Sequence, residues 1–121
     1  MSQNGSAFRM PPNPKRLNAL QLKTLTLLQE LAKHPLFVEP TEAGEGVVVN
    51  MLPDAHGDHF HIGPRVVMGK DATGLRNPAV WKALDRKGFV AQGDDGRYVV
   101  TAAGLDYPTG LRDKILHGSD H

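Results

Sequence analysis

Three of the six histidines in this chain of 121 residues fall within six positions, and two aspartates stand among them. The cluster consists of Asp54, His56, Asp58, His59 and His61. If the chain is extended here, His59 and His61 point to one face, and His56 or an aspartate folds over from the turn. Such a set suits Zn²⁺ or another borderline metal, because these ions accept imidazole nitrogens and carboxylate oxygens as ligands. A bound metal with a coordinated water could also catalyse hydrolysis.

The same residues have two other interpretations. Their spacing matches no established metal motif, and histidine and aspartate are common in polar turns. A pH-sensitive surface is the third interpretation, because imidazoles beside carboxylates titrate near neutral pH. We therefore expect no obligatory cofactor, and we keep a zinc ion held by His56, His59 and His61 as the alternative.

Other catalytic patterns are absent from the sequence. There is no cysteine, which excludes disulfides, thiolate metal sites and thiol nucleophiles. The serines are Ser2, Ser6 and Ser119, all near the chain ends, and no phosphate-binding glycine loop or nucleophile elbow occurs. The chain is therefore predicted not to be an enzyme. The lack of cysteine fits a reducing compartment, and we expect a cytoplasmic location.

Charge is unevenly distributed, although the formal net charge is only +1. Residues 1–35 are mostly basic, residues 36–58 carry five carboxylates and no Lys or Arg, and residues 59–100 carry seven basic and four acidic side chains. This segregation would direct an anionic partner to particular segments, unless it is a chance pattern in a small protein. No apolar run reaches the roughly 18 residues of a membrane span, so no membrane partner is expected.

The first strong helix signal begins at Asn18, which can form a capping box with Gln21. Leucines then recur on more than one side of the helix, which predicts a buried central helix. The predicted end is at His34 and Pro35, because the residue before a proline disfavours the helical conformation.

Two apolar segments follow, at 46–52 and 59–68. They predict a β-hairpin, or two strands joined by a longer loop. Pro64 interrupts the second segment and predicts an edge strand or a bulge there. A polar loop with one helical turn near 71–75 then leads into the next helix.

The most consistent local signals come after that loop. Asn77 followed by Pro78 predicts the start of a helix, and Gly88 predicts its end. Two short apolar runs on either side of residues 93–96 predict a β-hairpin. Thr101 then predicts the cap of another short helix, so the order is helix, hairpin and cap.

This order resembles winged helix-turn-helix domains, particularly those of the MarR-like kind, over residues 77–107. In that family the recognition helix ends in a pattern like xxLxxxGxV, which residues 81–90 match. A hairpin wing follows, matched by residues 91–100, and the next helix opens with Thr-x-x-Gly, matched by Thr101 and Gly104. The resemblance implies a protein that binds double-stranded DNA, as a small transcriptional regulator. It also implies that a homodimer can form, for which exposed leucines of the first helix could supply an interface.

One feature departs from the family pattern. The family places a second helix just before the recognition helix, whereas residues 36–76 here predict a β-hairpin and acidic loops. The predicted fold is therefore an α+β winged-helix domain with a β-hairpin inserted between the first helix and the recognition-like helix. It would span residues 15–112, between flexible tails at 1–14 and 113–121.

The predicted recognition helix has two distinct faces. Helical spacing turns one set of side chains inward, namely Val80, Trp81 and Leu84, and another set outward, namely Ala79, Lys82, Ala83 and Arg86. Small residues beside long cations suit insertion into a major groove, although an ordinary solvated face is the alternative. The residues predicted to contact DNA are Arg76, Asn77, Lys82, Arg86, Lys87 and Arg97.

The predicted wing carries charge of the opposite sign. Asp94 and Asp95 form its tip, where phosphates would repel them, and Arg97 compensates only in part. We therefore expect the helix to dominate DNA binding. The acidic tip and the acidic segment 39–58 favour an alternative function, a protein–protein interaction module built on the winged-helix scaffold.

Overall fold

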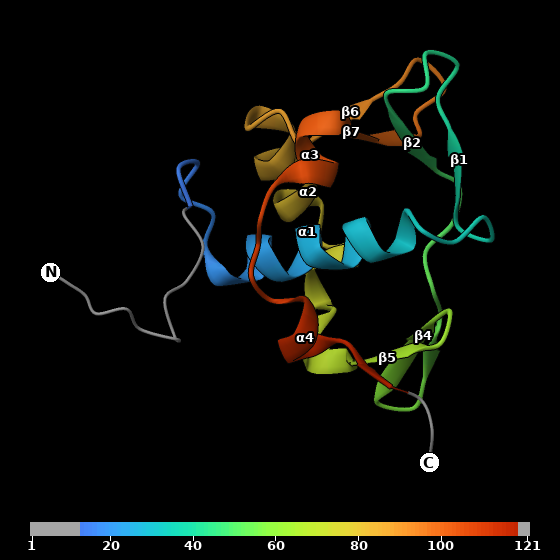
Figure 1. Cartoon of the computed structure of the whole chain (residues 1–121), viewed down its shortest axis with the longest axis vertical. Coiled ribbons are helices and arrows are strands. Elements are labelled where there is room, and N and C mark those ends of the chain that lie inside the picture. Colours follow the sequence, from blue (N-terminus) through green and yellow to red (C-terminus); the bar gives the residue numbers. More distant parts are fainter. Residues whose placement is uncertain (1–12, 119–121) are drawn as a thin grey trace, which may run out of the picture.

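The computed structural model describes residues 13–118 and confirms an α+β architecture (Figure 1). The elements in chain order are α1 (Ala19–Leu31), β1 (Val38–Pro40), β2 (Gly46–Val49), β3 (Ala55–His56), β4 (His59–Ile62), β5 (Arg65–Met68), the 3₁₀ helices η1 (Gly69–Asp71) and η2 (Thr73–Arg76), α2 (Pro78–Arg86), β6 (Val90–Gln92), β7 (Tyr98–Thr101), α3 (Ala102–Asp106), α4 (Arg112–Ile115) and β8 (His117–Gly118). The described strands form two antiparallel sheets, with the orders β1-β2-β7-β6 and β3-β4-β5-β8. In Figure 1, α1 crosses the middle of the molecule between these sheets.

The predicted tails fall only partly within the described residues. Residues 1–12 and 119–121 lie outside them. Asn13 is held against the start of α1, because its side chain exchanges hydrogen bonds of 2.9 and 3.1 Å with the backbone of Leu17. At the other end, residues 113–118 contain the end of α4 and the strand β8, which pairs with β5.

Helix α1 begins as predicted. The Asn18 side chain accepts a hydrogen bond from the backbone N–H of Gln21 at 2.8 Å, and the Gln21 side chain accepts one from the Asn18 N–H at 3.0 Å. The helix ends at Leu31, three residues before the predicted end at His34, and a turn continues to His34 through its N–H bond to the Leu31 carbonyl. The capping box therefore sets the start of α1, whereas the proline only limits how far the chain can continue.

The buried leucines of α1 leave little of this helix for a partner. Its fully buried side chains lie on several sides of the helix, namely Thr24, Leu25, Thr26, Leu27, Leu28 and Leu31. Leu20 and Leu22 are half-buried and pack against the same core. The predicted dimer interface of exposed leucines on α1 is therefore wrong, because this protein uses those side chains inside its own core.

The predicted pairing of segment 46–52 with segment 59–68 is also wrong. Strand β2 pairs with β1 on one side and with β7 on the other, in the sheet that carries the predicted wing. Segment 59–68 instead folds back on itself as the hairpin β4–β5. Each segment therefore belongs to a different sheet, and the insertion is larger than the single hairpin that was predicted.

Pro64 lies in a turn, which explains the hairpin β4–β5. Ile62 pairs with Arg65, so the loop contains only Gly63 and Pro64. Gly63 has a φ of +57°, and a glycine with positive φ at the first loop position is typical of type II′ hairpins. A proline in the turn costs no ladder hydrogen bond, so neither the predicted edge strand nor the bulge is needed.

The helical turn predicted near 71–75 is present as the two 3₁₀ helices η1 and η2. They pack on α1, where Gly74 lies so close to Thr24 that an added Cβ would sit 1.9 Å from the hydroxyl oxygen. The Lys23 ammonium also forms an ion pair of 2.9 Å with Asp71 in η1. This packing places the start of α2 directly after a segment fixed to α1.

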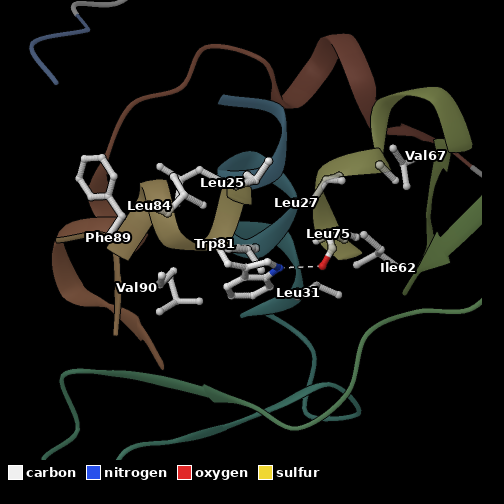
Figure 2. Close-up of a cluster of buried hydrophobic side chains, with 14 of the residues drawn as sticks. Leu25, Leu27, Leu31, Ile62, Val67, Leu75, Trp81, Leu84, Phe89 and Val90 are labelled. Atoms are coloured by element: carbon white, nitrogen blue, oxygen red, sulfur yellow. Dashed lines mark hydrogen bonds between the residues drawn. The ribbon is translucent and has the colours of Figure 1, made fainter. Parts of the chain in front are cut away.

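The core surrounds α1 and extends from α2 and the first sheet to the second sheet (Figure 2). Its largest buried side chains outside α1 include Ile62, Val67, Leu84, Phe89, Val90 and Val100. Trp81 of α2 reaches across toward η2, where its indole contacts the Leu75 carbonyl. The inward face predicted for α2 is confirmed, because Val80, Trp81 and Leu84 are all buried.

The predicted hairpin and cap after α2 are confirmed. Strands β6 and β7 pair antiparallel, and the turn between them contains Gly96 with a φ of +87°. The Thr101 hydroxyl accepts a hydrogen bond from the Gly104 N–H at 3.1 Å and donates one to the Gly88 carbonyl at 2.7 Å. Thr101 therefore caps α3 and ties it to the end of α2.

Candidate functional site

The local sequence holds α2 in place at both of its ends. At the start, the Asn77 side-chain oxygen accepts a hydrogen bond from the Ala79 N–H at 3.0 Å, and Pro78 occupies the first helical position. At the end, Gly88 has a φ of +84°, and the Phe89 N–H bonds to the Leu84 carbonyl. The side-chain oxygen of Asn77 is engaged in the cap, whereas its amide nitrogen makes no hydrogen bond among the described residues.

The outward face of α2 is narrower than predicted. Ala79, Lys82 and Arg86 are exposed. Ala83, predicted to share this face, is buried at 5% exposure, so that prediction is wrong. Helix α2 contacts α1, η2 and β6 together, which makes its buried face wider than a single apolar stripe. Asp85 is also exposed, so one carboxylate adjoins the cationic face.

Lys82 and Arg86 differ from the other predicted DNA contacts in one respect. Within residues 13–118, neither side chain makes a hydrogen bond or an ion pair. They lie one helical turn apart on the exposed side of α2, with the small Ala79 one turn earlier. Their charges can therefore meet an anionic surface without first breaking a bond to any residue in the described part of the chain.

Arg76 and Lys87 flank α2, and each is tied to another segment. Arg76 donates to the Pro53 carbonyl at 3.0 Å and lies 3.5 Å from a carboxylate oxygen of Asp54. Lys87 donates to the Lys15 carbonyl at 2.8 Å, which brings the segment before α1 to the end of α2. Lys15 is exposed there, so its positive charge adds to this end of the helix.

The contact between Lys87 and Lys15 extends the cationic surface beyond the predicted DNA contacts. Arg16 is exposed beside Lys15, whereas Arg9 of the same basic stretch lies outside the described residues. The clustering of Lys15 and Arg16 was visible in the sequence, but their position beside Lys87 depends on a contact between residues 72 positions apart. Such a contact cannot be inferred from local spacing.

Arg97 turns toward the neighbouring hairpin. It forms an ion pair of 2.7 Å with Asp95 and lies 3.6 Å from Glu39, and it donates to the Asn50 side chain at 2.6 Å. The hydrogen bond and charge of Asp95 raise the pKa of Arg97, and the Arg97 guanidinium in turn lowers the pKa of Asp95. The charge of Arg97 is therefore largely balanced inside the first sheet.

The tips of the hairpins β1–β2 and β6–β7 enclose an acidic depression of about 370 Å³. Among the residues that line it are four carboxylates and one guanidinium, namely Glu39, Glu42, Asp94, Asp95 and Arg97. Asp94 is exposed and has no ion-pair partner in the part of the chain that the structure describes. This end of the molecule is therefore opposite in charge to the exposed face of α2.

A shallow apolar groove lies between α2 and the first sheet. The rings of Trp81 and Tyr98 are 4.7 Å apart between centroids, and Leu52 lines the groove beside them. Arg76 and Lys82 stand at one end of the groove. The groove continues the surface of α2 toward the sheet, so a ligand on α2 would meet apolar atoms as well as cations.

The three clustered histidines do come together. His56 of β3 pairs directly with His59 of β4, and His61 follows two residues later on the same side of β4. The ring centroids are 4.9 Å apart for His59 and His61, 5.3 Å for His56 and His61, and 6.4 Å for His56 and His59. The Asp58 carboxylate lies 3.4 Å from Nδ1 of His59. As their side chains stand, no group of three or more His, Asp or Glu residues in 13–118 forms a site that could hold a metal ion.

Comparison with known proteins adds no family to this description. No family model, curated protein or solved structure matches the chain significantly. None of the helices within residues 13–118 has both the length and the apolar character needed to cross a bilayer. The function is therefore inferred from the described side chains themselves.

Proposed function

We propose that this protein binds double-stranded DNA through the exposed face of α2. The observation that carries the proposal is the pair Lys82 and Arg86, which have no partner among residues 13–118 and stand on a helix capped at both ends. Long cations can reach phosphates or guanine edges, and the small Ala79 lets the helix come close to the groove floor. Lys15, Arg16 and Lys87 add positive charge at the end of α2, where a second stretch of backbone could be contacted.

The order of the elements supports a winged-helix assignment for this DNA-binding unit. The chain runs from α1 through β1–β5 and η1 to η2, and then to α2, the hairpin β6–β7 and the Thr101 cap. In the proposed assignment, η2 corresponds to the family's second helix. Strands β1–β5 and η1 are then an insertion between α1 and η2, of which β3–β5 belong to the second sheet. Because η2 is a short 3₁₀ segment rather than a full helix, α2 is held by its packing on α1 and by the Trp81 hydrogen bond.

The proposal is tested by titrating the full chain into a fluorescently labelled DNA duplex while anisotropy is recorded at several salt concentrations. We expect binding that weakens as salt rises, since cations on phosphates release counterions. The double variant Lys82→Ala with Arg86→Ala should bind more weakly, and its salt slope should fall by about 2 if each cation contacts one phosphate.

A charge-matched control is available on the other side of the molecule. The double variant Arg65→Ala with Lys70→Ala removes the same charge from β5 and η1, and should bind DNA like the wild type. Salt-independent binding, no binding to any duplex, or an equal loss in both double variants would each contradict a DNA site on α2.

A second function is favoured by the acidic depression between the hairpin tips. Four carboxylates gather there against one partly neutralised Arg97, which suits a basic protein segment rather than DNA. In this alternative, a winged-helix scaffold serves as a protein–protein interaction module. It predicts that charge reversal at Glu42 and Asp94 abolishes capture of a Lys-rich or Arg-rich peptide, whereas the double variant at Lys82 and Arg86 captures it normally.

A further inference from the structure

The histidine cluster has a structural cause that is independent of α2. Strands β3 and β4 are joined by a two-residue loop, Gly57 and Asp58, in which Gly57 has a φ of +69°. This tight turn sets His56 directly opposite His59 in the ladder. Directly opposed residues of an antiparallel pair present their side chains to the same face, and His61 lies on that face two positions later. The hairpin therefore gathers all three imidazoles on one face.

The spacing of the rings is close to that of three imidazoles around one metal ion. A tetrahedral ion about 2.0–2.1 Å from each nitrogen places the ring centres about 5 Å apart. Two of the three observed centroid separations, 4.9 and 5.3 Å, have this value, and the third, between His56 and His59, is 6.4 Å. The rings of His56 and His59 have to move closer together, and the nitrogens of all three rings have to turn toward one point, because the metal-free rings do not form a finished site.

Closure of the site requires side-chain rotation alone. His56 is exposed, so its ring is the one with most freedom to rotate, whereas His59 and His61 are half-buried. Rotation about the terminal torsion of histidine has a broad energy profile and turns the ring nitrogens, whereas bringing the rings of His56 and His59 closer requires a change of χ1. The metal-free rings do not form a finished site, and a bound ion would supply the energy that orients them.

Neighbouring carboxylates suit the role of supporting groups. Asp58 lies 3.4 Å from Nδ1 of His59, and a carboxylate at that nitrogen leaves Nε2 of the same ring for a metal. Asp54, His56 and His61 line one shallow depression, which gives an incoming ion a path and a nearby negative charge. Since the chain has no cysteine, its imidazoles favour zinc, nickel or copper over ions that prefer thiolates.

We propose that His56, His59 and His61 form a three-imidazole site for a divalent transition metal, with Zn²⁺ as the ion to test. The fourth position would be open to water. The site lies on β3 and β4, away from the α2 surface, so metal binding and DNA binding can be tested separately. By linking β3 to β4, the metal would stabilise the second sheet, and the melting temperature should rise with the Zn²⁺ concentration.

The test uses the full chain without a histidine tag, stripped with a chelator and dialysed, and titrated with ZnCl₂ in a calorimeter at pH 7.5. We expect one Zn²⁺ per chain. Co²⁺ should give visible d–d absorption of a nitrogen-coordinated ion. His61→Ala and, as a second variant, His59→Gln should each lose at least about tenfold in affinity, and Asp58→Asn should lose affinity by about tenfold through misorientation of His59.

The control is His117→Ala, because His117 is an exposed histidine of the same sheet, on β8, and lies outside the cluster. This variant should bind Zn²⁺ with the wild-type stoichiometry and affinity. Circular dichroism of each variant identifies any that do not fold, and the assignment then rests on the remaining cluster variant. Absence of a one-to-one site, wild-type affinity in folded His61→Ala and His59→Gln, or an equal loss in His117→Ala would overturn the proposal.

Discussion

The indole Nε1 of Trp81 donates a hydrogen bond of 2.7 Å to the backbone carbonyl of Leu75 (Figure 2). Both residues are buried, and the bond joins the middle of α2 to η2, which itself packs on α1. Leu75 lies in the last turn of η2, where a carbonyl has no partner within the helix, and Pro78 three residues later has no N–H to offer, so the indole supplies the donor. Trp81 therefore fixes the orientation in which α2 presents Lys82 and Arg86.

Replacing the indole removes this connection. Trp81→Phe keeps an aromatic ring in the core but leaves the Leu75 carbonyl buried without a donor, which costs about 1–3 kcal/mol. We expect the free energy of unfolding to fall by that amount in urea titrations followed by circular dichroism. Tyr98→Phe is the matched control, because the hydroxyl of Tyr98 makes no hydrogen bond within residues 13–118. A loss of less than about 0.5 kcal/mol in Trp81→Phe, or an equal loss in the control, would contradict this role.

Position 104, three residues after the Thr101 cap, has room only for a glycine. A Cβ at position 104 would lie 2.2 Å from the Phe89 carbonyl oxygen and 3.1 Å from a methyl group of Val100. Gly104→Ala should therefore push α3 away from β7 and weaken the Thr101 cap. We expect a loss of about 1–3 kcal/mol in the free energy of unfolding, measured by urea denaturation.

The control for this substitution is Gly93→Ala. At Gly93 the nearest atom to a new Cβ is 3.5 Å away, and the backbone conformation is an ordinary one. This variant should remain within about 0.5 kcal/mol of the wild type. Wild-type stability in Gly104→Ala would show that α3 can move without a loss in the free energy of unfolding. The hydrogen bond between Thr101 and the Gly88 carbonyl would then contribute little to stability.

Glu30 makes stability depend on pH. It is buried in α1, where Arg112 donates to its carboxylate at 2.9 Å and Lys33 donates at 3.2 Å. Burial alone would raise the pKa of Glu30, but the hydrogen bonds and charges of Arg112 and Lys33 outweigh it, and the pKa is lowered. A lowered pKa means that the carboxylate stabilises the fold above its unfolded pKa of about 4.3, and that this contribution is lost as pH falls through the folded value.

Glu30→Gln should therefore melt at a lower temperature than the wild type at pH 7, and the difference should shrink as the pH is lowered below about 4.3. Thermal melts between pH 7 and pH 3, followed by circular dichroism, measure this convergence. Glu42→Gln removes an exposed carboxylate with no ion pair among the described residues, and its melting temperature should follow the wild type throughout. A constant difference between Glu30→Gln and the wild type across this range would contradict the assigned role of Glu30.

Features that depend on adjacent residues were predictable from the sequence. The capping box of Asn18 with Gln21, the cap at Asn77 and the cap at Thr101 all form as predicted, because each requires only side chains within three positions of its helix. The same holds for the stop at Gly88 and for the turn between β6 and β7. The gathering of His59 and His61 on one face likewise follows from strand periodicity alone.

Features that depend on distant residues were not predictable. Strand β2 pairs with β7, about fifty residues later, and apolar spacing does not distinguish this partner from the nearer segment 59–68. Ala83 is buried because three elements pack around α2, which the periodicity of one helix cannot reveal. Arg97 is neutralised partly by Glu39, from a strand 58 positions earlier. Strand pairing between distant segments therefore determines the sheet order, and an ion pair between distant residues removes Arg97 from the charge available to DNA.

The charge at the tip of the hairpin β6–β7, the predicted wing, tests whether this hairpin lies beside bound DNA. Asp95 is neutralised by Arg97, whereas Asp94 has no ion-pair partner within residues 13–118 and carries the remaining negative charge of the tip. If the wing lies beside the phosphates, Asp94→Asn removes a repulsion of about 1 kcal/mol at a separation near 4 Å in water, and DNA affinity should rise about fivefold at low salt. Asp113→Asn makes the same charge change on α4, on the other side of α1 in Figure 1, and should leave the affinity unchanged. An equal gain in both variants would indicate a response to net charge alone, and no gain in Asp94→Asn would mean that the wing stays clear of the duplex while α2 binds it.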